Sequence, residues 1–118
     1  MSKFKLKLNQ MEMKTLGSCC VYAARNMGRV ECVAGLAILE TCERLWSRMR
    51  NMYRPDRDKY TLRLGAMEVH TLTATVLPAM RDMDEPIVRT MGYSFAEELR
   101  KQSEREINIY NAMRYGDA

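Results

Sequence analysis

The apolar residues of the chain recur with the period of an α-helix over its middle part, and the longest such stretch covers residues 30–53. Its second half is two-faced, with apolar side chains opposite charged ones. Its first half, Val30 to Leu39, is apolar around the whole axis, and Glu31 is its only charge. A helix of this kind must be covered on all sides. We expect the cover to come from the chain's own segments or from a second copy, with Gly35 at the closest approach.

A second long helix is predicted over residues 60–83, because the apolar residues there fall mostly on one face. Its length makes it the natural antiparallel partner of the helix over residues 30–53. Pro78 removes one hydrogen bond from this helix, so we expect a kink or an early end there.

Two shorter helical segments are predicted from their end signals. Ser18 can cap a helix over residues 18–27, which Gly28 ends. A short helical turn starts with Asp84, Glu85 and Pro86, and Gly92 closes it.

The last predicted helix covers residues 94–115. Ser94 and Glu97 have the spacing of a capping box, and Gly116 can supply the left-handed residue that ends the helix. One face has heptad spacing with a polar middle, which is typical of a surface that docks on another helix. The residues of this face are Phe95, Leu99, Gln102, Glu106, Ile109 and Met113.

Apolar and basic residues alternate from Phe4 to Leu8, which predicts a half-buried strand within a segment, residues 1–14, that is a strand or an arm. A lone strand cannot satisfy its backbone, so it needs a partner. The stretch from Tyr60 to Leu64 shows the same alternation, but we interpret it as helix. The strand would then pair with its twin in a second subunit, or form a loosely held arm.

These elements predict a mainly α fold, an antiparallel helical bundle in a single domain over residues 1–118. The N-terminus lacks the continuous apolar run of a signal peptide, and no run reaches transmembrane length. We therefore expect a cytoplasmic protein that does not bind a membrane.

Catalytic and metal-binding patterns are weak throughout. His70 is the only histidine, and none of the four cysteines has C-x-x-C spacing, so we interpret the cysteines as free thiols. The six glycines are scattered singly and form no phosphate-binding loop. The sequence predicts a protein that is not an enzyme and that uses no metal or cofactor.

Positive charge is concentrated in residues 44–63, which carry seven Lys/Arg against two Asp, although the whole chain has a net charge of only +4. Arginines interleaved with aromatic residues suit contact with phosphates and bases, or with an acidic protein. A solvated basic surface without a partner is the alternative. The candidate binding residues are Arg44, Arg48, Arg50, Arg54, Arg57, Lys59 and Arg63.

Two helix surfaces lack an evident cover within the chain: the start of the helix over residues 30–53, represented by Val33, Gly35 and Leu36, and the heptad face of the last helix. Both favour self-association. We therefore expect a small regulator or inhibitor that binds another protein and forms a homodimer or higher oligomer, as a viral accessory protein would. The alternatives are a nucleic-acid-binding module that uses the basic stretch, and a protein that sequesters a small ligand.

Overall fold

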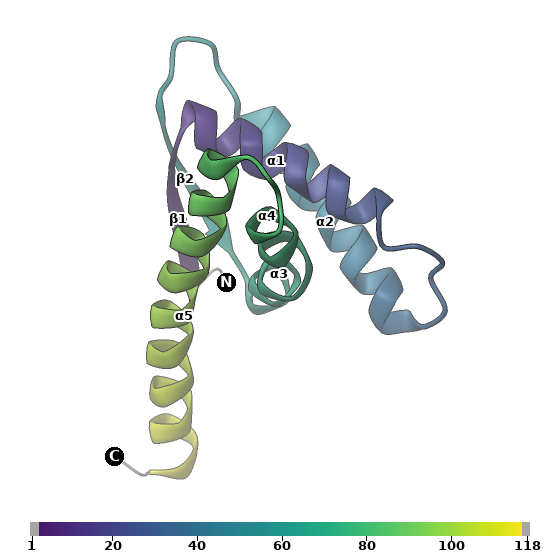
Figure 1. Ribbon diagram of the computed structural model, residues 1–118. Coiled ribbons are helices and arrows are strands. Elements are labelled where there is room, and N and C mark those ends of the chain that lie inside the picture. Colours follow the sequence, from purple (N-terminus) through teal and green to yellow (C-terminus); the bar gives the residue numbers. More distant parts are fainter. Residues whose placement is uncertain (1–2, 117–118) are drawn as a thin grey trace.

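The computed structural model describes residues 3–116, so residues 1 and 2 of the predicted arm and residues 117 and 118 of the predicted domain lie outside the described part. The fold is mainly α, as predicted, and it contains one small antiparallel sheet (Figure 1). The elements in chain order are β1 (Phe4–Asn9), α1 (Gln10–Arg25), α2 (Val33–Met52), β2 (Lys59–Leu64), α3 (Ala66–Thr71), a π-helical turn (Leu72–Val76), α4 (Leu77–Arg81) and α5 (Pro86–Tyr115).

The predicted N-terminal strand is present as β1, but its partner is β2 of the same chain, with Leu6 opposite Leu62. The prediction that a helix begins at Tyr60 was therefore wrong for residues 60–64. The physical reason is the period of two: Tyr60, Leu62 and Leu64 all point into the core, and pairing with β1 satisfies both backbones.

Helix α1 begins eight residues earlier than the prediction of a helix over residues 18–27. Its start is set by Asn9, whose side chain accepts a hydrogen bond from the Glu12 N–H (2.7 Å), while the Glu12 carboxylate accepts one from the Asn9 N–H (2.8 Å). This capping box turns the chain directly from β1 into the helix. Ser18 lies in mid-helix, and Gly28, with φ 74°, lies in the loop that follows α1.

Helix α2 lies within the predicted residues 30–53, but it packs mainly along α1 and makes a smaller contact with α3 of the segment that follows it. The close approach that we expected at Gly35 is made by Gly17 of α1. A Cβ at Gly17 would lie 3.8 Å from Trp46 Cδ1 and 3.9 Å from Met49 Cβ.

Only residues 66–81 of the second predicted long helix are helical, in three short pieces. Pro78 lies in the first turn of α4, and the turn before it is widened, so that the Leu77 N–H bonds to the Leu72 carbonyl five residues earlier. The expected disturbance at Pro78 is thus a π-helical turn on its N-terminal side.

Helix α5 is a single helix of 30 residues, whereas the sequence predicted a short turn closed by Gly92 and a new helix from Ser94. Gly92 does not end a helix. It is buried where α5 crosses α4, and a Cβ there would lie 3.1 Å from Met80 Cβ and 3.2 Å from the Arg81 backbone N. Gly116 ends α5 with φ 63°, as predicted.

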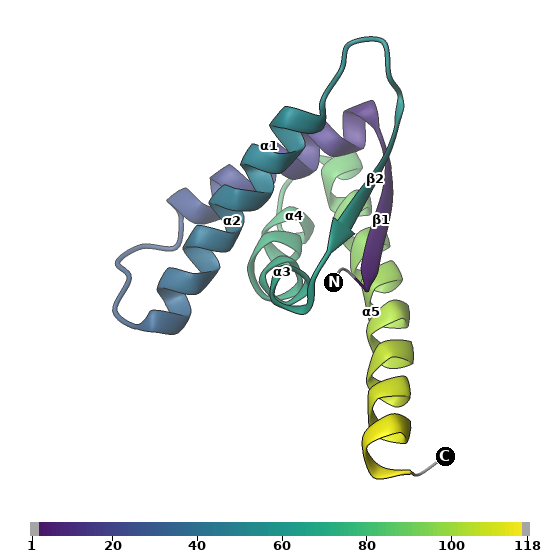
Figure 2. The same cartoon turned by 180° about the vertical axis from the view of Figure 1, so that it is seen from behind.

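The core lies between the inner face of the sheet and the surrounding helices. Figures 1 and 2 show α1 and α2 side by side on one flank, α5 on the other, and α3 and α4 between them. Leu16, Leu45, Leu62, Leu72 and Leu99 are fully buried there. Within residues 3–116, no helix has both the length and the hydropathy needed to cross a membrane.

Candidate functional site

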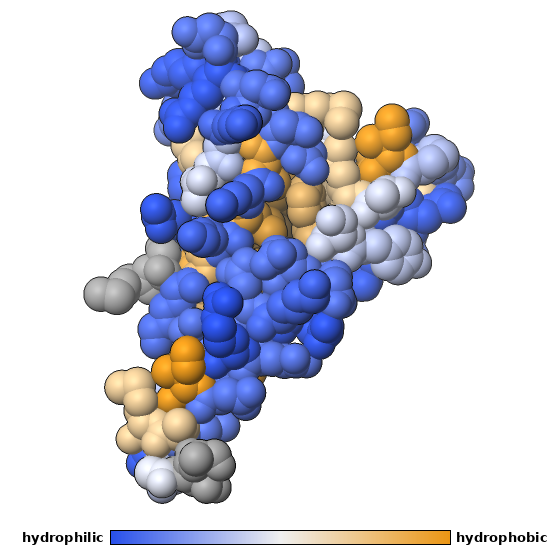
Figure 3. Space-filling view, turned by 90° about the vertical axis from the view of Figure 1, so that its left-hand side faces the viewer, coloured by the Kyte–Doolittle hydropathy of each residue, from blue (hydrophilic) through white to orange (hydrophobic). Residues whose placement is uncertain are grey.

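The second half of α5, residues 103–115, projects beyond the body of the protein (Figure 1). We call it the distal half. Figure 3 shows apolar side chains at this end of the molecule, and a hydrophilic surface separates them from further apolar patches on the upper part of that face. The large apolar residues exposed on the distal half are Ile107, Ile109, Tyr110, Met113 and Tyr115.

The predicted heptad face of α5 divides into a covered and an uncovered part. Phe95, Leu99 and Gln102 are buried within the chain, so they cannot contribute to an interface between copies. Ile109 is 46% exposed and Met113 is 81% exposed. Of the predicted interface on α5, therefore, only the last two turns and the half-buried Glu106 remain available.

Gln102 explains why the middle of this face is polar. Its side-chain oxygen accepts a hydrogen bond from the Lys5 N–H (3.0 Å), and its side-chain nitrogen donates to the Lys5 carbonyl (2.8 Å). The amide thus bonds to the outer edge of β1 as a neighbouring strand would. The polar residue at this position therefore stabilises the chain's own sheet.

The first turn of α2 is exposed as well. Val33 is 81% exposed and Leu36 is 45% exposed. A Cβ at Gly35 would meet only the side chains of Val30 (3.6 Å) and Cys32 (3.8 Å). No other helix of the described chain approaches this glycine closely, so Val33 and Leu36 are exposed and only the segment before α2 partly covers Gly35.

The predicted basic residues on α2 do not act together. Arg48 pairs with Glu68 of α3 and also donates to the Arg63 carbonyl, which fixes the open edge of β2. Arg50 lies over the ring of Trp46, with 4.4 Å between its Cζ and the ring centroid. These two arginines have structural contacts at different places on the helix, and Arg44 donates a long hydrogen bond to the Thr41 hydroxyl (3.5 Å).

The remaining predicted cations, Arg54, Arg57, Lys59 and Arg63, gather at the loop before β2 and on β2 itself. Two side chains hold this loop. The Tyr60 hydroxyl lies 3.0 Å from the Arg54 carbonyl and 2.9 Å from the Arg57 carbonyl, and the Gln10 side chain donates to the same carbonyls and to that of Pro55.

Sequence reasoning missed Lys5 and Lys7, which stand on the outward face of β1 beside Lys59 and Arg63 of β2. The signal was present in both segments, because each alternates apolar residues with polar or basic ones. Finding the shared face required the pairing of two strands about 50 residues apart, which alternation in either strand does not reveal.

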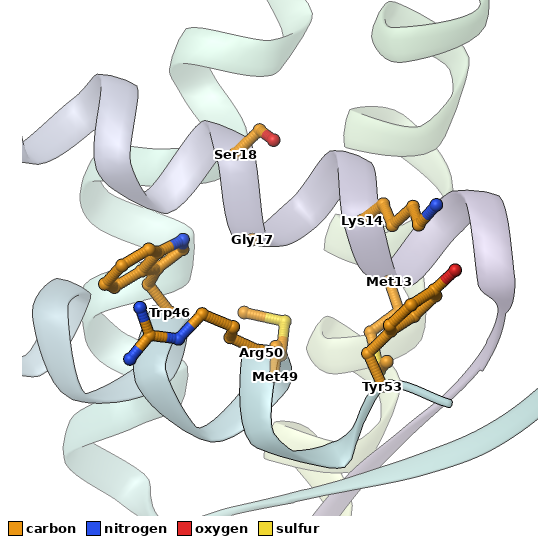
Figure 4. A pocket seen from close by; sticks show the side chains of 8 residues that line it. All are labelled: Met13, Lys14, Gly17, Ser18, Trp46, Met49, Arg50 and Tyr53. Carbon is orange, nitrogen blue, oxygen red and sulfur yellow. The ribbon is translucent and has the colours of Figure 1, made fainter. Parts of the chain in front are cut away.

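An open groove of about 320 Å³ runs between α1 and α2 (Figure 4). Gly17 leaves space at its floor, and two cation–π pairs flank it: Arg50 on Trp46, and Lys14 over Tyr53 at 4.6 Å from the ring centroid. No carboxylate lines the groove. It suits a flat apolar group that carries a negative charge.

The chain's thiols and histidine form no reactive cluster in the described part, where no three potential metal ligands come together. Cys19, Cys20 and Cys42 are buried, and burial raises the pKa of each thiol. Cys32 is exposed, and so is His70.

Comparison with protein-family models, with curated proteins and with solved structures found no match to this chain. Its function is therefore argued from its own surfaces.

Proposed function

We propose that this chain is a non-enzymatic interaction protein that self-associates through the distal half of α5. The observation that carries the proposal is the continuity of one stripe. The face that packs on the body through Leu99 and Gln102 runs on past the body through Glu106, Ile109 and Met113. The stripe residues keep the same spacing, but beyond Gln102 the rest of the chain no longer buries them.

A second copy of the chain is the occupant that this stripe fits best, because the stripe complements itself. It carries an acid at its start, Glu106, and apolar side chains after it, and a base, Arg114, flanks it beside Met113. Two such stripes laid antiparallel place the acid of each copy beside the base of the other, as in a two-fold dimer.

The length of the distal half fits this arrangement. If Glu106 lies beside Arg114 of the second copy, the crossing point is at Tyr110, and Gly116 of one copy lies beside Glu104 of the other. That position is just beyond Gln102, where the chain's own cover ends. The overlap of about 20 Å is short compared with standard interfaces, so we expect a weak, concentration-dependent dimer.

The wider role that we propose is that of a cytoplasmic regulator or inhibitor that binds another macromolecule. The support is indirect: the exposed start of α2 provides a second apolar surface, and soft methionine-rich surfaces suit partner binding.

Light scattering coupled to size exclusion tests self-association. At roughly 10 to 100 µM protein, the wild-type mass should rise with concentration above the 13.7 kDa of one chain. The double variant Ile109→Glu, Met113→Glu should stay monomeric. The matched control is Asn108→Glu, which adds a negative charge to the same half of α5 on the side of the helix away from the stripe, and it should behave as wild type. A strictly monomeric wild type contradicts the proposal.

A further inference from the structure

The outward face of the two-stranded sheet is basic. It is formed by Lys5 and Lys7 of β1 and by Lys59 and Arg63 of β2, all exposed, and we call it the basic sheet face. The other outward residues of the strands are Asn9 and Thr61, so the face carries no carboxylate and no large apolar side chain.

Strand register brings two of these cations directly together. Lys5 stands opposite Arg63. Both backbone groups of Lys5 bond to Gln102, so this pair is not hydrogen-bonded across the strands. Side chains are closest in pairs of that kind, and like charges placed there destabilise a sheet.

The chain does not compensate this repulsion with ion pairs. None of the four cations lies within 4.0 Å of a carboxylate oxygen in the described part. The carboxylates that flank the sheet are engaged elsewhere: Glu12 caps α1, Glu98 accepts from Gln102, and Glu68 pairs with Arg48. Glu12 and Glu98 share a hollow with two of the cations but form no ion pair with them in the described part, so all four cations remain available to an external anion.

A hollow of about 740 Å³ continues the basic sheet face toward the loop before β2. Lys7, Lys59 and Arg57 line it, and its one carboxylate, Asp58, accepts a hydrogen bond from the Gln10 N–H. The bonds of Tyr60 and Gln10 to the loop carbonyls hold this wall in place, so little ordering is needed when an anion binds.

We propose that the basic sheet face binds the sugar-phosphate backbone of a nucleic acid. The two lysines of β1 lie two residues apart, about 6.8 Å, and the two cations of β2 lie four residues apart in a second row beside them. Such rows suit a regular line of phosphates. The Thr61 hydroxyl and the Asn9 amide add neutral donors to the rows. The face itself has no aromatic or large apolar side chain that could stack on bases or enter a lipid surface, and the hollow beside it adds only Leu8, Met52 and the buried Tyr60, so binding should be independent of sequence.

This proposal is independent of the self-association surface, because it uses other residues on another part of the molecule. Fluorescence anisotropy tests it with labelled duplex DNA and single-stranded RNA of about 20 nucleotides. If all four cations contact phosphates, the slope of log K against log salt is about −3.6 for the duplex and about −2.8 for the single strand. Affinity should then fall roughly 150-fold for the duplex between about 50 and about 200 mM salt.

Charge-neutralising variants locate the surface. Lys7→Gln and Arg63→Gln should each reduce the duplex slope by about 0.9 and weaken binding equally for unrelated sequences. The control is Lys101→Gln on the exposed surface of α5, which removes the same charge and should leave the slope unchanged. Circular dichroism verifies that each variant is folded.

Three results would overturn the proposal. The first is the absence of binding to either oligonucleotide at about 50 mM salt. The second is an equal loss of slope in Lys101→Gln and Lys7→Gln, which would assign binding to net charge. The third is tighter binding to polyglutamate or to phosphatidylserine vesicles than to the oligonucleotides, which would make the partner an acidic protein or a membrane.

Discussion

The two halves of α5 carry one stripe of side chains but meet different surroundings. Up to Gln102 the stripe is buried against β1, α4 and the core, and from residue 103 onward no residue of the helix is buried. The length of α5 is therefore not set by the chain's own core. The distal half needs another partner for its apolar residues, because an isolated helical end of this length is marginal in water.

Shortening one side chain of the stripe in each half of α5 should give the largest difference in the free energy of unfolding. Leu99→Ala removes a fully buried side chain and should lower the free energy of unfolding by about 2 to 5 kcal/mol. Met113→Ala should change it by less than about 0.5 kcal/mol in dilute protein, because Met113 is exposed. Urea denaturation measures both. Equal effects would mean that the distal half is part of the monomer's core.

Two glycines sharpen the comparison between covered and uncovered helix surfaces. Gly92→Ala should destabilise the protein by about 1 to 3 kcal/mol, because the new Cβ would press on Met80 and on the backbone of Arg81. Gly35→Ala should stabilise it by up to about 1 kcal/mol, because alanine favours a helix and the new Cβ makes only ordinary contacts. Thermal denaturation shows whether each variant is more or less stable than the wild type. A stabilised Gly92→Ala variant would contradict the close crossing of α5 and α4.

The polar positions of the stripe offer a smaller test. Gln102→Ala removes both hydrogen bonds to Lys5 and should cost about 1 to 2 kcal/mol of unfolding free energy. Glu106→Ala, one turn further on, should leave monomer stability nearly unchanged and weaken only the dimer. Denaturation of dilute samples separates the two, and a neutral Gln102→Ala would show that the strand edge is satisfied by water.

Thiol reactivity probes the start of α2 without changing stability. At neutral pH, Cys32 should react quickly with a disulfide reagent, whereas the raised pKa and the burial of Cys19, Cys20 and Cys42 should keep these three thiols unreactive until the protein unfolds. A colorimetric count of reacted thiols gives one per native chain. Protection of Cys32 that increases with protein concentration would place the start of α2 in an interface.

The helical class and most helix positions could be predicted from apolar periodicity, but the boundaries depended on tertiary contacts. Ser94 and Glu97 have the spacing of a capping box, yet α5 runs through them because Gly92 is needed for packing on α4. Glu97 instead forms an ion pair with Arg100 (2.7 Å). Conversely, the capping box at Asn9 and Glu12 was overlooked because the segment after β1 continues to alternate.

For the candidate sites, the sequence predicted which types of residue are present but only partly how they lie relative to one another. The concentration of arginines before and on β2 was visible, yet Arg48 and Arg50 have structural contacts, and Lys7 joins the basic face through strand pairing. Tyr60 to Leu64 was assigned to a helix because five residues fit either period when the next apolar residues continue a helical pattern.

Hydrogen exchange of the α5 amides at two protein concentrations tests the central claim most directly. The amides from residue 90 to 102 should be protected equally in dilute and concentrated samples, because the chain's own core covers them. The amides of the distal half should exchange quickly when dilute and become protected when concentrated. Fast exchange of the distal half at every concentration, or equal protection at every concentration, would contradict an interface between copies there.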